Sequence, residues 1–333
     1  AVCGENKTRQ DQLKISIATN YALCYYYVMN KLKVAVIGAG HLGSIHAKIY
    51  KQIPACTLVG VCDTNPASLK AVCGSLRVPG YSNYHELFGK IDAASIAVPT
   101  LLHHQVARDF LEKDMHLLVE KPFTVDLKQA DDLIEIAKEK NLILQVGHIE
   151  RFNSAFCATQ KIIQNPKFIE CHRLSVFPNR SLDVGAVLDI MIHDIDIVLG
   201  LVNSPLERVE SVGVNVLTPF EDIANARLTF KNGCIANLTA SRVSDEVMRK
   251  IRIIQEDTYI SLDYKNAEAS VYRRIQGKIS KERLPIEKEQ PLQKELASFV
   301  DCVINKKPPL VSGPVAREAL AVALEIQNQI WHK

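Results

Sequence analysis

The chain has 333 residues, of which 47% are hydrophobic and 23% charged. Its 40 Lys and Arg residues against 37 Asp and Glu residues give a net charge of +3, and the two signs are interspersed. This composition favours about two globular domains and argues against a nucleic-acid or membrane surface as the partner. We expect a soluble, cytoplasmic protein in which short basic pairs such as Arg249-Lys250 lie on solvated faces.

The nine cysteines are scattered along the chain and form no CxxC pair. This pattern disfavours both a disulfide framework and a zinc site. Several cysteines, among them Cys62 and Cys234, fall within apolar strand patterns, which is typical of small buried residues in a reducing compartment. We expect no bound metal.

Residues 1–28 do not fit the pattern of the rest. The moderately apolar run 15–29 is interrupted by Thr19 and Asn20 and is shorter than the roughly 20 apolar residues that span a bilayer. It also lacks a small-residue cleavage site. We expect this segment to be an extension outside the fold, and Met29 to stand at the natural start.

An apolar run at residues 33–37 breaks into a glycine-rich turn that is followed by a helical pattern. The first glycine of a GxGxxG turn permits the bend, the second lets the backbone approach a pyrophosphate, and the third lets the helix pack closely. Free N–H groups at the helix N-terminus then face the phosphates. The turn predicts a dinucleotide site, to which five residues contribute: Gly38, Gly40, His41, Leu42 and Gly43.

A second predicted strand, 57–62, ends at Asp63. The distance from the third glycine is the one at which an acidic residue binds the ribose hydroxyls of a dinucleotide. An acid here would repel a 2′-phosphate, and Thr64-Asn65 offers no arginine to neutralise it. The sequence therefore predicts NAD in preference to NADP. The alternative to a dinucleotide site is a purely structural turn followed by an unrelated acidic residue.

Strands and helices alternate from Lys33 to about Gln164, and we place an NAD-binding domain at residues 29–150. We expect strands at 33–37, 57–62, 93–98, 116–120 and 142–146, and helices at 42–52, 66–76, 103–113, 127–140 and after Arg151. This order predicts a doubly wound parallel sheet, in which ligands bind beyond the carboxyl ends of the strands. Three segments follow strand ends and should converge there: Val98-Pro99-Thr100, Glu120-Lys121-Pro122 and Gly147-His148.

The remaining chain, residues 151–333, is rich in strands and predicts an α+β domain with a large, mainly antiparallel open sheet. We expect strands at 168–176, 206–217, 223–230, 234–240, 250–255, 259–263 and 270–273, and helices at 185–201, 291–304 and 314–331. Asn232-Gly233 is the signal of a tight hairpin.

The predicted helix at 187–201 is apolar on nearly every side, so we expect it to be buried. Asp189, His193 and Asp196 are spaced i, i+4, i+7 and would share one stripe, which needs polar partners. A metal would require a third ligand that is not evident, and a structural His–Asp pair is a further interpretation.

Lys121 directly follows a strand end, and Pro122 restricts the backbone behind it. A lysine beside an acid–base histidine suits alcohol oxidation. The base removes the hydroxyl proton while the cation stabilises the developing alkoxide.

Together these motifs resemble the glucose-fructose oxidoreductase and inositol dehydrogenase family from about Lys31 to the C-terminus. The resemblance rests on the Gly38–Gly43 turn, Val98-Pro99-Thr100 with His103, Glu120-Lys121-Pro122, and the spacing of Asp189 and His193. It implies a Rossmann domain, NAD(P)-dependent oxidation of sugars or cyclitols, and a homo-oligomer, dimer or tetramer, formed through the antiparallel sheet.

The resemblance also implies roles for single residues. Lys121 and His193 become the catalytic pair, with Asp189 as a substrate ligand or orienting group. The nicotinamide side of the cofactor site would be formed by Pro99, Thr100, His103, Glu120, Lys121 and Pro122. Met191 departs from the family, which commonly has glycine there.

Within the family, the run Gly147–Asn153 is similar to enzymes that oxidise the 3-hydroxyl of UDP-N-acetylglucosamine ahead of 3-amino-sugar formation in lipid A. A diphosphate needs cationic ligands, for which Arg151, Arg173 and Arg180 are candidates. The substrate-binding residues would then be Lys121, His148, Arg151, Asn153, Arg180, Asp189 and His193.

Other functions within the same family stay open. One is an inositol or free-sugar dehydrogenase, another is a glycosidase that uses bound NAD for transient oxidation, and a third is a sugar-sensing regulator without turnover. The presence of both Lys121 and His193 argues against the regulator. Product analysis separates the hydrolase from the dehydrogenase.

Overall fold

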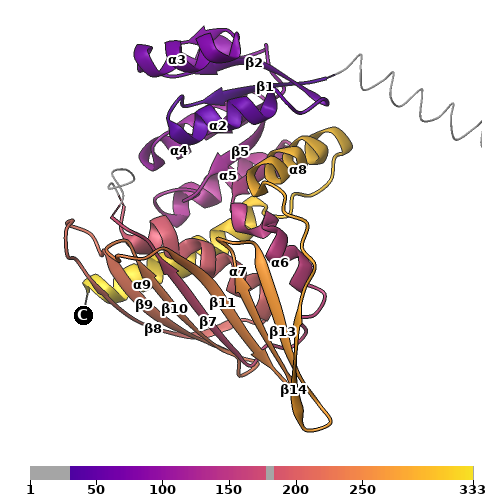
Figure 1. Cartoon of the computed structure of the whole chain (residues 1–333). Helices are drawn as coiled ribbons and strands as arrows, with labels where there is room; N and C mark the ends of the chain where they lie inside the picture. Colours follow the sequence, from indigo (N-terminus) through magenta and orange to yellow (C-terminus); the bar gives the residue numbers. More distant parts are fainter. Residues whose placement is uncertain (1–30, 178–183, 333) are drawn as a thin grey trace, which may run out of the picture. The chain divides into compact units, whose positions relative to one another are not determined.

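The computed structural model describes residues 31–177 and 184–332, so the predicted extension at 1–28 and Arg180 lie outside the described residues. The chain divides into two compact units, the first ending at Ala94 and the second beginning at Ser95 (Figure 1). The domain boundary between residues 150 and 151 stays a prediction.

The first unit contains the first βαβ repeats. Its elements are β1 (Leu32–Ile37), α2 (His41–Tyr50), β2 (Cys56–Cys62), α3 (Pro66–Leu76), β3 (Gly80–Tyr81) and a 3-10 helix (Tyr84–Leu87). β1 and β2 pair in parallel, and the residues of β1 from Val34 onward are buried. Strand β3 was not predicted, because its two residues are too few to show an alternating pattern.

The next elements continue the alternation. They are β4 (Ala93–Ile96), a 3-10 helix (Thr100–Leu102), α4 (His103–Glu112), β5 (His116–Glu120), α5 (Leu127–Glu139) and β6 (Leu144–Gly147). Six strands form one sheet in the order β3-β2-β1-β4-β5-β6. The jump from β3-β2-β1 to β4-β5-β6 is the strand order of a doubly wound sheet, which confirms the predicted fold.

The rest of the second unit is an eight-stranded sheet with helices on one face (Figure 1). Its helical segments are 3-10 Ile149–Phe152, α6 (Ser154–Thr159), a π-helical turn (Val187–Met191), α7 (Ile192–Val202), α8 (Pro291–Asn305) and α9 (Gly313–Trp331). Its strands are β7 (Phe168–Leu174), β8 (Leu206–Val214), β9 (Ile223–Phe230), β10 (Ile235–Ser241), β11 (Met248–Gln255), β12 (Thr258–Asp263), β13 (Glu268–Ile275) and β14 (Lys278–Arg283).

The strand order of this sheet is β14-β13-β12-β11-β7-β10-β9-β8. The sheet is mainly antiparallel, as predicted, but β7 and β10 pair in parallel at its centre. Strand β14 was not predicted, because all six of its residues are exposed and leave no alternation of apolar and polar positions.

Alternate residues of the central strands are buried under the helices. In β7 these include Ile169 and Cys171, and α7 contributes Ile195 and Ile197 to the same core. α9 packs on β8 and against α7, so the apolar helix predicted from the sequence is enclosed. No helix within the described ranges is long and apolar enough to cross a bilayer.

Candidate functional site

The glycine-rich turn has the geometry that its sequence predicts. Gly38 has a φ of 104°, a backbone conformation that glycine adopts readily and other residues rarely do. A Cβ atom on Gly43 would lie 1.9 Å from the Gly38 carbonyl oxygen, so only glycine permits this approach of α2 to the turn. A Cβ atom on Gly40 would meet no described atom within 4 Å, which leaves this stretch of backbone open to a ligand.

The first turn of α2 is suited to a pyrophosphate. Because the N-cap residue is Gly40, no side chain caps the helix, and its first backbone N–H groups lack intrahelical partners. The exposed His41 and the half-buried Leu42 stand in this turn. A helix N-terminus of this kind stabilises bound phosphate through its N–H groups and its dipole.

Asp63 ties the end of β2 to the glycine-rich turn. Its Oδ2 accepts a hydrogen bond of 2.5 Å from the Ala39 N–H, and its Oδ1 accepts one of 2.7 Å from the Asn65 N–H. The carboxylate is half-buried and keeps acceptor positions for ribose hydroxyls. The residues of the first unit that are predicted to hold the pyrophosphate and adenosine ribose of NAD are Gly38, Gly40, His41, Leu42, Gly43 and Asp63.

In the second unit, Lys121 and Asp189 are in contact although 68 residues separate them in the sequence. The Lys121 Nζ donates to the main-chain oxygen of Asp189 at 2.6 Å and to its Oδ1 at 2.9 Å. Both side chains are largely buried, at 18% and 14% exposed. An ammonium group has three N–H donors, so one remains for a substrate oxygen.

Asp189 lies in the π-helical turn Val187–Met191, where the sequence predicted a continuous α-helix. A π turn holds more residues than an α turn, so the spacing i, i+4, i+7 does not define one stripe here. Asp196 is accordingly not paired with His193. The carboxylate of Asp196 instead accepts a hydrogen bond from Arg151, with a distance of 2.6 Å between Nε and Oδ2. Met191 is fully buried.

His193, near the start of α7, lies beside His148. The two rings meet edge to face, with their centroids 6.2 Å apart and their planes at 84°. Neither ring nitrogen of His148 has a hydrogen-bond partner among the described residues, nor does the His193 Nδ1. Burial lowers the pKa of His193 well below its ordinary value, and the charge of Lys121 lowers it further. His193 is therefore neutral at pH 7 and able to accept a proton.

Comparison with known proteins gives two family matches that together cover most of the chain. An oxidoreductase family with an NAD-binding Rossmann fold matches residues 32–148, and the GFO/IDH/MocA C-terminal domain matches residues 146–260. The chain belongs to the Gfo/Idh/MocA family. It is therefore a member of a family of NAD-binding oxidoreductases.

The UDP-N-acetylglucosamine 3-dehydrogenase of Acidithiobacillus ferrooxidans is 36% identical to this chain over 90% of this chain and 97% of its own length. Its crystal structure superposes with a TM-score of 0.86 and covers 90% of this chain and 98% of that one. The myo-inositol 2-dehydrogenase of Thermotoga maritima is 26% identical over 91% of this chain and 97% of its own length. The Gfo/Idh/MocA relatives thus include both nucleotide-sugar and cyclitol dehydrogenases.

Two arginines that the sequence offered as phosphate ligands are used inside this Gfo/Idh/MocA chain. Arg151 is bound to Asp196, and Arg173 donates to Glu150 at 2.8 Å and to Asp194 at 2.7 Å. Both guanidinium groups are buried. Both charges are therefore paired within the protein, and a role of Arg151 or Arg173 as a diphosphate ligand stays a prediction.

Asn153 is also a structural residue. Its Oδ1 accepts the Ala155 N–H at the start of α6, and its Nδ2 donates to Glu150 and to the Tyr264 carbonyl. The side chain is only 4% exposed, so all its hydrogen bonds are made within the protein. The structure thus shows only internal partners for Asn153, and its role in substrate binding stays a prediction.

His103 braces the loops that follow β4 and β5. Its Nδ1 lies 2.9 Å from the Pro122 carbonyl oxygen and its Nε2 lies 2.9 Å from that of Val98. Burial lowers the pKa of His103, so the neutral ring donates to one of these carbonyls. Nearby, Pro99 is exposed and Thr100 is buried, and the Lys121–Pro122 peptide is cis. His103 thus positions the segments expected near the nicotinamide.

Two buried glutamates, Glu120 on β5 and Glu295 on α8, interact electrostatically. Glu120 packs so closely on Gly147 that a Cβ atom there would lie 2.8 Å from its Oε2. Glu295 on α8 is fully buried, and neither of its oxygens has a hydrogen-bond partner within the described part of the chain. Burial raises the pKa of Glu295 well above its ordinary value, and Glu120 and Asp196 raise it further. The burial of Glu295 could have been predicted from the sequence, because Glu295 lies on the apolar stripe of its helix with Phe299 and Cys302.

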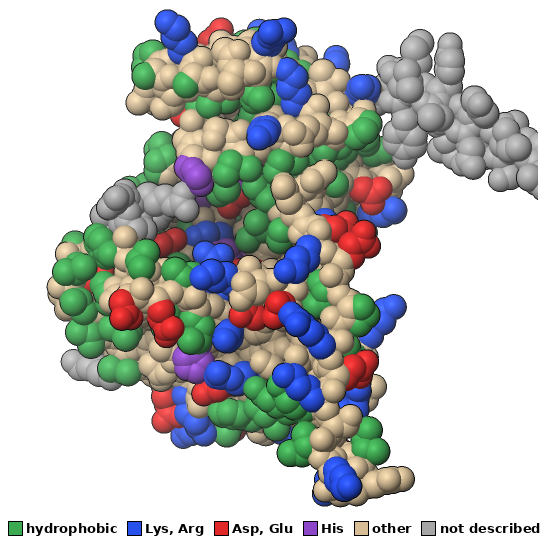
Figure 2. Space-filling view, viewed as in Figure 1, with side chains coloured by type: hydrophobic (Ala, Val, Ile, Leu, Met, Phe, Trp, Pro, Cys, Tyr) green, Lys and Arg blue, Asp and Glu red, His purple; other side chains and the backbone are tan. Residues whose placement is uncertain are grey.

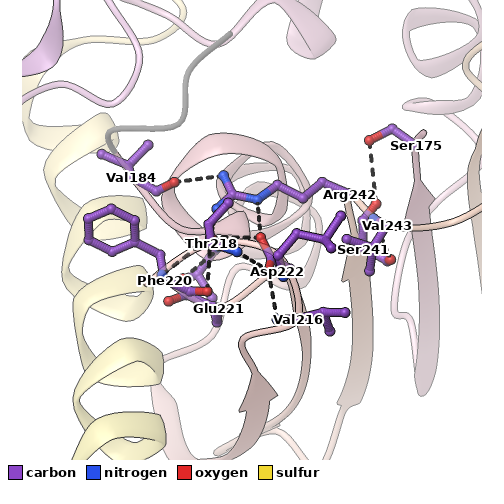
Figure 3. Close-up of polar contacts among 12 residues, drawn as sticks. Ser175, Val184, Val216, Thr218, Phe220, Glu221, Asp222, Ser241, Arg242 and Val243 are labelled. Atoms are coloured by element: carbon purple, nitrogen blue, oxygen red, sulfur yellow. Dashed lines mark hydrogen bonds and ion pairs between the residues drawn. The ribbon is translucent and has the colours of Figure 1, made fainter. Parts of the chain in front are cut away.

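A polar network that the sequence did not predict holds the segment leading into the π turn (Figure 3). Arg242 is fully buried and donates to Asp222 at 2.8 Å and to the Val184 carbonyl at 2.7 Å. The neighbouring Glu221 accepts the Val187 N–H at 3.2 Å, the first residue of the π turn. The network therefore fixes the start of the segment that carries Asp189.

Proposed function

We propose that this protein is an NAD-dependent dehydrogenase that oxidises a secondary hydroxyl of a nucleotide sugar, namely the C3 hydroxyl of UDP-N-acetylglucosamine. The observation that carries the proposal is the contact of Lys121 and Asp189 in the same unit as a neutral, half-buried His193. The choice of substrate is supported by the 36% identity with the Acidithiobacillus ferrooxidans enzyme over nearly its whole length.

The cofactor is assigned to the glycine-rich turn. Gly40 and the first turn of α2 would hold the pyrophosphate of NAD, and Asp63 the adenosine ribose. NAD supplies the hydride acceptor that the oxidation of an alcohol requires.

The chain supplies the proton chemistry. In its neutral form, His193 takes the proton of the substrate hydroxyl as general base. The Lys121 N–H that Asp189 does not use donates to the same oxygen and stabilises its developing negative charge. Asp189 keeps the ammonium group in place, so little reorganisation is needed during the reaction.

The test is NADH formation with a panel of UDP-sugars, free sugars and cyclitols. We expect turnover with UDP-N-acetylglucosamine, most clearly when an aminotransferase removes the unstable 3-keto product. Free hexoses and inositols should be poor substrates. Robust turnover of inositol with none of any UDP-sugar would overturn the proposal, and glycoside cleavage without net NADH formation would identify a glycosidase.

An inositol dehydrogenase is the second candidate. It is supported by the 26% identity with the myo-inositol 2-dehydrogenase of Thermotoga maritima over 91% of this chain. The same substrate panel separates the two functions.

We further propose a cytoplasmic homo-oligomer, dimer or tetramer, that serves lipid A or surface-polysaccharide synthesis. The oligomer is supported by hydrophobic side chains on the large sheet near β13 and β14 (Figure 2). They line a shallow hollow of about 300 Å³ that includes Ile254, Tyr259, Tyr272 and Ile279. Light scattering after size exclusion tests it, and a monomeric mass at micromolar concentration would contradict it.

A further inference from the structure

Arg249 on β11 lies on the same face of the large sheet as the buried Arg173. The two residues are directly opposite each other in the antiparallel pairing of β11 with β7. Side chains of directly opposite residues point to the same side of a sheet. The Arg173 side chain reaches Asp194 on α7, next to His193, so Arg249 also leaves the sheet on the side of α7.

Within the described residues, Arg249 lacks the acidic ion-pair partner that each of the other two basic residues of β11 has near it. Lys250 lies 4.0 Å from Asp263, and Arg252 lies 2.8 Å from Glu170. Arg249 is exposed, and among residues 31–177 and 184–332 its side chain has no ion pair or hydrogen bond. The expectation that this basic pair is solvated fits the exposed Arg249, while Lys250 is half-buried and points to the other side of the sheet.

The position of Arg249 opposite Arg173 also destabilises the sheet. Like charges directly opposite each other on neighbouring strands destabilise a sheet. Arg173 forms ion pairs with Glu150 and Asp194, whereas Arg249 is attracted by the charge of Asp194 without forming an ion pair with a described residue. The two charges are close to the catalytic histidine as well, since Arg173 and Arg249 both lower the pKa of His193. A ligand anion would supply the direct ion pair that Arg249 does not make with a described residue.

We propose that Arg249 binds the diphosphate of the nucleotide-sugar substrate. A guanidinium group pairs with phosphate oxygens through two parallel hydrogen bonds. Arg249 differs from Arg151 and Arg173, whose guanidinium groups are already paired with buried carboxylates. The inference rests on the proposed function.

The test compares Arg249→Ala and Arg249→Lys with Lys250→Ala, which removes the same charge from the opposite face of the same strand. With UDP-N-acetylglucosamine we expect the KM of Arg249→Ala to rise about tenfold or more, with kcat changed far less. Arg249→Lys should lie between this variant and the wild type. Lys250→Ala should keep the wild-type KM.

Calorimetric titration with UDP, a diphosphate without the sugar, gives a readout that does not depend on turnover. Arg249→Ala should lose UDP binding and Lys250→Ala should retain it, with both variants melting at the wild-type temperature. An unchanged KM and UDP affinity in Arg249→Ala, while the wild type oxidises UDP-N-acetylglucosamine, would overturn this inference alone. Equal losses of UDP affinity in Arg249→Ala and Lys250→Ala would also overturn this inference. A wild type that neither binds UDP nor turns over UDP-sugars would overturn the proposed function as well.

Discussion

The Nζ of Lys121 is held twice by Asp189, once by the carboxylate and once by the main-chain carbonyl oxygen. The second contact does not depend on the side chain of Asp189. The two residues should therefore respond differently to substitution.

We expect Lys121→Met to lower turnover by about a hundredfold or more, because it removes the donor that stabilises the alkoxide. Asp189→Asn should cost less and act mainly on substrate affinity, since the main-chain contact and an amide oxygen still hold Lys121. Steady-state kinetics of both variants check this, with NAD titrations to show that cofactor binding is intact. A larger loss in Asp189→Asn than in Lys121→Met would contradict the assignment.

We expect His193→Asn to lower turnover by about a hundredfold or more, as for a positioned base. Since the pKa of His193 is lowered well below its ordinary value, the base stays neutral, and the acid limb of kcat/KM should lie well below about pH 6.5. His148→Phe removes a neighbour that lowers the pKa of His193, so the limb should move to higher pH. A limb that His148→Phe leaves in place, or near-normal turnover in His193→Asn, would show that the histidines are structural.

The carboxylate of Asp63 predicts tighter binding of NAD than of NADP, because it would repel a 2′-phosphate. Fluorescence titration of the wild type with both cofactors measures the difference. Asp63→Ala should reduce the difference in affinity between NAD and NADP. The variant also loses the hydrogen bond from the Ala39 N–H. Tighter binding of NADP by the wild type would contradict the prediction.

Glu295 should make the protein less stable as the pH rises. Its folded-state pKa is raised, so its protonated form is favoured in the folded protein, and stability falls above its unfolded pKa of about 4.3. Each unit by which the pKa is raised corresponds to about 1.4 kcal/mol at full effect. Glu295→Gln keeps the shape without the acidic proton and should melt at higher temperature at pH 8, with a smaller difference at pH 5.

The exposed Glu287 provides the matched control for this measurement. Glu287→Gln removes the same acid from a solvated position and should leave the melting temperature almost unchanged across the same pH range. If the two glutamine variants behaved alike, the burial of Glu295 would have no bearing on stability.

The sequence predicted those parts of the fold that are written in local patterns. The glycine-rich turn, the alternation of strands and helices and the apolar α7 each depend on neighbouring residues, and all three were recognised. The placement of Lys121 at a strand end and of His193 on a buried helix was accessible for the same reason. Topology then brings Lys121 to Asp189.

The partners of the buried charges could not be predicted in this way. Arg151 meets Asp196, 45 residues later, and Arg173 meets Asp194, 21 residues later, and no short pattern specifies either pair. The face on which Arg249 lies follows from its register with β7, which depends on how distant strands align. Long-range pairing therefore decides which arginines remain available to a ligand.

The π turn at Val187–Met191 makes the number of residues in this segment as important as their identity. One residue fewer would let ordinary α-helical hydrogen bonding continue from 187 into α7. Each residue of an α-helix advances about 100° around the axis, so deletion of Ile190 would turn Asp189 away from its present position relative to His193. We expect a chain lacking Ile190 to keep its helix content and lose its turnover. In such a chain Lys121, Asp189 and His193 would all still be present. The deletion of a single codon would nevertheless have removed the geometry in which they act together.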